Sequence, residues 1–189
     1  MSKEKSFILI VALIVLGIGS RFLFLIEGYP QIPNFTALGA VALFGAYYLK
    51  KAQSIIIPLA ILWISDIVLN NVVYSEYYTS FSFFGDPWVN LGFIATIVTG
   101  WYMLKKLSVK SLLGASLIGA FVFYLITNFS SWLTIDLYPK NLEGLITCYI
   151  KGIPFFRNAF LGNVFFSAVL FGSYAYFTKE KIGFSFSNQ

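Results

Sequence analysis

The chain has 189 residues, of which 58% are hydrophobic and only 11% are charged, and its formal net charge is +5. Soluble domains contain roughly 45–50% hydrophobic and about 25% charged residues, so this balance excludes an ordinary soluble protein, which would expose large apolar areas to water. With one cysteine and no histidine, the chain also lacks the means for an intramolecular disulfide, a multi-cysteine metal site or histidine-based catalysis.

Six apolar segments predict an all-α integral membrane protein, because about 20 apolar residues cross the hydrocarbon core as a helix. In chain order the segments cover residues of about 7–26, 35–49, 54–73, 87–104, 111–133 and 154–177. The first is longer than the apolar region of a signal peptide, so we expect it to be a retained helix. The second is shorter than a full span, so we expect it inside the bundle or where the bilayer is thin.

Two connecting segments have a pattern of their own. Residues 141–151 place Leu142, Leu145, Ile146 and Tyr149 at helical spacing, which predicts a short amphipathic outer helix between the fifth and sixth helices. Residues 74–86 are rich in Tyr, Phe and Ser. This segment is either part of an interfacial aromatic belt or a lid over a binding site.

The charges predict the orientation of the bundle. Basic residues precede the first helix and follow the second, fourth and sixth, whereas the other connections have few positive residues and carry Glu27, Glu76, Asp86, Asp136 and Glu143. By the positive-inside rule both termini lie in the cytoplasm, and we expect a multi-pass protein of the bacterial inner membrane with one domain over residues 1–189. Because the basic residues are clustered at helix ends and form no continuous stripe, nucleic acid is not an expected partner.

Strongly polar side chains gather in the outer halves of the predicted helices, which indicates an outward-facing cavity. We expect Asp66 to face the bundle and to pair with Arg157, because an unpaired charge inside a membrane is costly. Amides line the predicted site and two tryptophans provide stacking surfaces. The predicted substrate-binding residues are Asn34, Asp66, Asn70, Trp88, Asn128, Trp132, Arg157 and Asn158.

Two of these patterns have a structural alternative. The asparagines can serve as interhelical hydrogen-bond partners without binding any solute. Small residues spaced four apart, Ala42 with Ala46 and Ala115 with Gly119, indicate either close packing within the bundle or docking of another membrane subunit. We find no nucleophile–base pair, phosphate-binding loop or metal motif, and therefore predict no enzyme activity, catalytic residue, metal or cofactor.

Several segments resemble an uncharacterised family of small bacterial membrane proteins named only for an inferred role in transport. The resemblance rests on residues 33–47 (PNFTALGAVALFGAY), Ser65-Asp66, Thr127-Asn128-Phe129, Tyr138-Pro139 and residues 148–158 (CYIKGIPFFRN) with Leu161-Gly162. That family is in turn similar to the substrate-binding S components of energy-coupling-factor (ECF) vitamin transporters.

The resemblance implies six helices, an outward-facing pocket and transfer of the solute with a membrane scaffold subunit and cytoplasmic ATPases. Without histidine, nickel or cobalt capture by imidazole is excluded, which favours a small organic, vitamin-like solute. Lipids, this solute and the scaffold subunit are therefore the expected partners. The alternative is a non-transporting membrane subunit whose polar residues hold the helices together.

Overall fold

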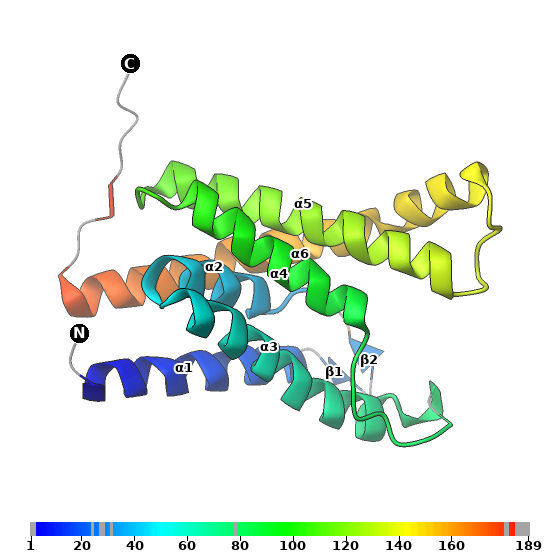
Figure 1. Ribbon diagram of the computed structural model, residues 1–189, viewed down its shortest axis with the longest axis horizontal. Coiled ribbons are helices and arrows are strands. Elements are labelled where there is room, and N and C mark those ends of the chain that lie inside the picture. Colours follow the sequence, from blue (N-terminus) through cyan, green and yellow to red (C-terminus); the bar gives the residue numbers. More distant parts are fainter. Residues whose placement is uncertain are drawn as a thin grey trace, which may run out of the picture.

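The computed structural model describes residues 3–23, 25–26, 29–30, 32–77, 79–179 and 182–183. Six α-helices run lengthwise through one elongated bundle in this part of the chain (Figure 1). They are α1 (Lys3–Phe22), α2 (Leu38–Tyr48), α3 (Lys51–Val68), α4 (Pro87–Met103), α5 (Val109–Thr134) and α6 (Leu142–Thr178). A π-helical turn, Leu69–Val73, extends α3, and a 3-10 turn covers Ser75–Tyr77. The two-residue strands β1 (Leu25–Ile26) and β2 (Tyr29–Pro30) pair antiparallel.

Three helices begin where the sequence provides a capping side chain. A carboxylate oxygen of Asp86 accepts a hydrogen bond from the Trp88 amide at 2.8 Å, with a proline in the first turn of α4. Ser108 caps α5 in a reciprocal capping box, and Asn141 caps α6 by accepting from the Gly144 amide at 2.9 Å. These short-range bonds satisfy amide groups that have no partner within the helix.

The sequence-based expectation of a separate amphipathic helix before the sixth helix is wrong. Residues 142–151 form the first part of α6, which continues through Pro154 without a break. Proline removes one backbone hydrogen bond, but the first part of α6 is also bonded to α5 through Tyr124 and Tyr149, as described below. At the other end of the chain, α1 ends at Phe22, before the expected end at residue 26.

The centre of the bundle is α2, in which every residue from Leu38 to Gly45 is buried. It packs against α3, α4 and α6. Small residues let the helix axes approach closely, because the Gly100 backbone of α4 lies directly against Ala46 and Leu43. Ala42 and Ala115 are completely buried, so both small-residue faces serve packing within the bundle.

Three helices are long and apolar enough to cross a membrane: Lys51–Val73, Val109–Thr134 and Leu142–Thr178. The two C-terminal ones expose much of their apolar surface, including Leu117, Phe121 and Phe165. Such a surface is unfavourable in water and favourable in lipid. These features are those of a membrane protein.

The two ends of the bundle differ in charge. The start of α1, the α2–α3 and α4–α5 connections and the end of α6 lie together on the left in Figure 1. We call this the lysine end, after the lysines that it carries: Lys50, Lys51, Lys105, Lys106, Lys110 and Lys179. The opposite end, where α4 and α6 begin, contains the cavity described below and is called the cavity end.

We predict that the close approach of α4 to α2 makes Gly100→Ala destabilising. A methyl group at Gly100 would overlap the Ala46 methyl group and press on Leu43, so we expect a loss of about 1–3 kcal/mol. The matched control is Gly172→Ala on α6, where open space surrounds the new methyl group, and a gain of up to about 1 kcal/mol is expected from helix propensity. Thermal unfolding of both variants in detergent tests this, and equal melting temperatures would contradict it.

Candidate binding cavity

A cavity of about 510 Å³ lies at the cavity end of the bundle. Its wall comes from the end of α1, residues 32–38, the C-terminal part of α3, the start of α4 and the α5–α6 hairpin. The floor is buried and includes Ser20, Leu38, Leu62 and Cys148, whereas the rim includes exposed residues such as Asn34. The space is therefore closed toward the centre of the bundle and bounded by exposed residues at its end.

The polar groups of the cavity are mostly hydroxyls and amides. Lining residues of this kind are Ser20, Asn34, Thr36, Tyr74, Thr127, Asn128, Ser131 and Tyr138. Burial raises the pKa of the Tyr74 hydroxyl above its ordinary value, while the Arg21 charge acts in the opposite direction, so Tyr74 is a neutral donor near pH 7. Apolar surface from Phe93 and Phe123 completes the wall. This is the mixed lining typical of sites for small organic molecules.

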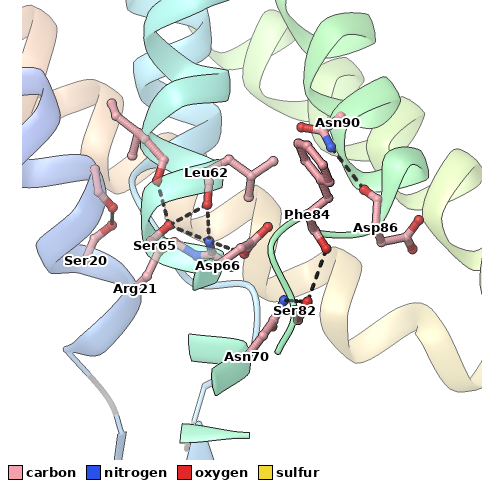
Figure 2. A network of polar contacts seen from close by, with 12 residues as sticks. Ser20, Arg21, Leu62, Ser65, Asp66, Asn70, Ser82, Phe84, Asp86 and Asn90 are labelled. Atoms are coloured by element: carbon pink, nitrogen blue, oxygen red, sulfur yellow. Dashed lines mark hydrogen bonds and ion pairs between the residues drawn. The ribbon is translucent and has the colours of Figure 1, made fainter. Parts of the chain in front are cut away.

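An ion pair between Arg21 of α1 and Asp66 of α3 supports one side of the cavity (Figure 2). Nη1 of Arg21 lies 2.6 Å from the Asp66 carboxylate and 2.6 Å from the Ser65 hydroxyl oxygen, and 3.3 Å from the Leu62 carbonyl oxygen. The Arg21 and Asp66 side chains are only 18% and 12% exposed. Arg21 lines the cavity, whereas Asp66 lies behind it as the counter-charge.

The loop of residues 79–86 packs against this ion pair at the cavity end. Gly85 lies directly against the Asp66 carboxylate, where no side chain would fit. Ser82, three residues before Gly85, is bonded to two amide side chains at the end of the extended α3. Asn71 donates to the Ser82 carbonyl oxygen at 2.8 Å and accepts from the Ser82 backbone amide at 2.7 Å. Asn70 donates to the Ser82 hydroxyl oxygen at 3.3 Å (Figure 2). Trp63 donates to the Phe83 carbonyl oxygen at 3.0 Å. The loop is thus attached to α3 by side chains of α3 itself.

The opposite side of the cavity is the α5–α6 hairpin, whose two helices are joined by hydrogen bonds from tyrosine hydroxyls to backbone carbonyl oxygens. The Tyr124 hydroxyl donates to the Tyr149 carbonyl oxygen at 2.6 Å, and the Tyr149 hydroxyl donates to the Leu125 carbonyl oxygen at 2.8 Å. The Asn128 side chain fits against Gly152, which leaves no room for a Cβ atom there. Asn128, Cys148 and Gly152 all face the cavity.

The expectation that Arg157 pairs with Asp66 is wrong, because Asp66 pairs with Arg21. Arg157 is exposed on α6 and does not line the cavity. Arg21 lies in the last turn of α1, and the ion pair spans 45 positions in sequence. Arg21 was not considered as a partner from the sequence, although it too lies near one end of its predicted helix.

The structure places the other predicted site residues in three groups. Asn34 and Asn128 line the cavity. Asn70 and Asn158 are buried and used in structural hydrogen bonds, the latter by donating to the Pro33 carbonyl oxygen at 3.0 Å. Trp88 packs near Phe129, and Trp132 donates to the Pro139 carbonyl oxygen at 2.9 Å; neither lines the cavity.

Two basic residues of the lining were missed by sequence reasoning, Arg21 and Lys151. A basic residue at the outer end of a predicted helix, against the positive-inside pattern, is a signal that could have identified each of them. As for metals, the described part of the chain contains no group of three or more Cys, Asp or Glu side chains that could hold an ion.

These features define a class: a helical membrane protein with a ligand-sized cavity at one end. The chain belongs to the family of unknown function DUF6580, whose sequence pattern matches residues 1–184. No curated protein and no solved structure matches the chain. Because the family description assigns no function, the resemblance to S components remains a prediction.

We predict that Arg21→Gln lowers stability by about 2–4 kcal/mol, because it leaves the Asp66 carboxylate with little water and no counter-charge. Replacing both residues, Arg21→Gln with Asp66→Asn, removes the charges together and is expected to restore part of the loss. Arg157→Gln is the control, with a change within about 0.5 kcal/mol expected for an exposed residue. Thermal unfolding of the wild type, these variants and Asp66→Asn alone tests the pair, and strictly additive losses in the double variant would contradict it.

Proposed function

We propose that this protein captures a small organic, vitamin-like solute in its cavity from the outer side of the bacterial cytoplasmic membrane. The observation that carries the proposal is the cavity of about 510 Å³ with a buried floor and an exposed rim, at the end opposite the lysine end. Its volume falls in the range of about 300–1,000 Å³ that is usual for small-molecule sites. Its lining offers several hydroxyl and amide groups for recognition and no catalytic pair, which favours binding over chemistry.

The proposal includes a topology in which all six helices cross the membrane and the lysine end faces the cytoplasm. The clustering of lysines at one end supports it through the positive-inside rule. The short helix α2 is compatible with this arrangement, because its neighbours cover it and it does not need to match the bilayer thickness by itself. The cavity would then open toward the outside.

Release of the solute into the cell requires either a partner or an ion gradient, since the sequence contains no ATP-binding motif. The resemblance to S components favours a membrane scaffold with cytoplasmic ATPases as this partner. The small-residue faces of α2 and α5 are buried within the bundle, so such a scaffold would bind a different surface of the chain.

Native mass spectrometry of the protein purified in mild detergent tests the function. We expect an additional small-molecule mass on the wild type and its loss from Ser131→Phe, which fills the cavity with a ring. Leu133→Phe is the matched control, because Leu133 is exposed on the same helix and lies outside the cavity lining. Absence of any bound small molecule from the wild type, or its retention in Ser131→Phe, would count against solute capture.

A second candidate function, a non-transporting membrane subunit, is favoured by the way most amides are used. Asn70, Asn71 and Asn158 all bond to other parts of the chain and hold the outer loops in place. Under this function the cavity stays empty and the polar cluster is structural.

For Asn158 we predict a structural role under either function. Asn158→Ala removes the bond to the Pro33 carbonyl oxygen and is expected to cost about 1 kcal/mol. The melting temperature measures this loss, and the mass of any bound solute should persist in the variant. Unchanged stability together with loss of that mass would instead place Asn158 in the binding site.

A further inference from the structure

The charged side chains that line the cavity are both basic. They are Arg21 on the inner side and Lys151 on the rim, and no Asp or Glu belongs to the lining among the residues that the structure describes. When all charged groups of an apolar cavity have the same sign, the cavity favours a solute of the opposite charge.

Arg21 is compensated by Asp66, which lies 2.6 Å from it. The described hydrogen bonds of Arg21 all leave from Nη1. The guanidinium carries further N–H groups, so it can still donate a hydrogen bond to a solute, but the pair contributes little net charge.

Lys151 has no ion-pair partner in the part of the chain that the structure describes. Asp136 lies 3.9 Å from Lys140, is fully exposed to solvent and is outside the cavity lining, so it adds little negative charge to the cavity. Glu143 lies on the same helix as Lys151 but two turns earlier, about 12 Å along the axis, which is beyond the screening length of about 8–10 Å at moderate salt. Lys151 therefore provides the uncompensated charge of the cavity.

We propose that the cavity selects a small organic anion, whose charged group pairs with Lys151 at the rim. Asn128 lines the same hairpin wall and donates one amide N–H to the Tyr124 carbonyl oxygen at 2.9 Å, which leaves its second amide N–H for the anionic group. The hydroxyls of Thr127 and Ser131 donate to carbonyl groups of α5, so their oxygens can accept from other polar groups of the solute. The apolar body of the solute would lie against Phe93 and Phe123. This inference rests on the proposed function and adds the charge class of the solute.

The single cysteine of the chain, Cys148, lines the cavity and provides a reporter that needs no knowledge of the solute. Its thiolate attacks a methanethiosulfonate reagent, forms a disulfide and releases methanesulfinate. The anionic sulfonatoethyl reagent and the cationic trimethylammonioethyl reagent are compared. Both reagents react with the same thiolate, so the ratio of their rates does not depend on the thiol pKa. We divide this ratio by the ratio measured for free 2-mercaptoethanol, and the normalised ratio then reports the local electrostatic potential.

For the wild type in detergent we expect this normalised ratio to favour the anionic reagent about fivefold, as one nearby unit charge predicts. Lys151→Gln should bring the ratio close to one. Two matched controls each remove one positive charge elsewhere. Arg157→Gln changes a residue that follows Lys151 by six positions on α6 and lies outside the lining, and Lys110→Gln changes a residue at the lysine end. Neither control should change the ratio by more than about 1.5-fold. A wild-type ratio at or below one, or a ratio unchanged by Lys151→Gln, would overturn the inference.

A second reporter position covers the case in which Cys148 is too deeply buried to react. Ser131→Cys in a Cys148→Ser background places a thiol on the half-buried part of the same wall. The expected ratio and its dependence on Lys151 are the same. Failure of the anionic reagent to react at both positions would also overturn the inference.

The outcomes separate this inference from the proposed function. An anionic preference that depends on Lys151, with no solute mass on the purified protein, counts against solute capture alone. A bound neutral or cationic solute that Lys151→Gln retains counts against the anion inference alone.

Discussion

The ion pair between Arg21 and Asp66 is the contact on which the cavity end of the bundle depends. Helix α1 packs mainly against α3, with fewer contacts to α2, so few other interactions fix where its outer end lies. In surroundings with little water, a guanidinium held at 2.6 Å from a carboxylate is both strong and specific in direction. The adjacent Ser20 hydroxyl accepts a hydrogen bond from the Ala37 amide at 2.9 Å, which joins the start of α2 to the same point. Three helices are thereby fixed around one wall of the cavity.

The general distribution of polar residues was predictable from the sequence, whereas their individual roles were not. Depth along the predicted helices correctly indicated a polar end and a cavity there, since side chains that need partners gather where partners exist. Which asparagine faces the cavity depends on where the nearest unsatisfied backbone groups lie. Asn158 bonds to the Pro33 carbonyl oxygen and Asn71 to Ser82, and these loop groups have no periodic pattern that reveals their position. Asn34 lines the cavity in a left-handed backbone conformation with φ of 65°, which the sequence does not display either.

Helix boundaries show the same division between local and tertiary causes. The starts of α4 and α5 follow from capping residues that lie within three positions of the helix, and the predicted boundaries agree to within two residues. The continuity of α6 across Pro154 has a tertiary cause instead. The hydroxyls of Tyr124 and Tyr149 each donate to a carbonyl group of the partner helix, and these bonds hold the residues before the proline alongside α5. No pattern within residues 141–158 reveals that support, because half of it comes from α5.

The cavity lies between two walls that are each bonded internally and that share few direct contacts with one another. One wall is the α1–α3 pair with its ion pair, and the other is the α5–α6 hairpin with its tyrosine bonds. Because the charges of the first wall compensate each other, moving one wall relative to the other separates no ion pair. Such a motion would change the distance between Lys151 on the hairpin and Arg21 on α1. An anion that pairs with Lys151 and accepts a hydrogen bond from a further N–H group of Arg21 would favour the closer arrangement. Under the proposed function, solute binding and the relative position of the two walls are therefore coupled through the rim charge, while the ion pair behind Arg21 keeps its own wall intact.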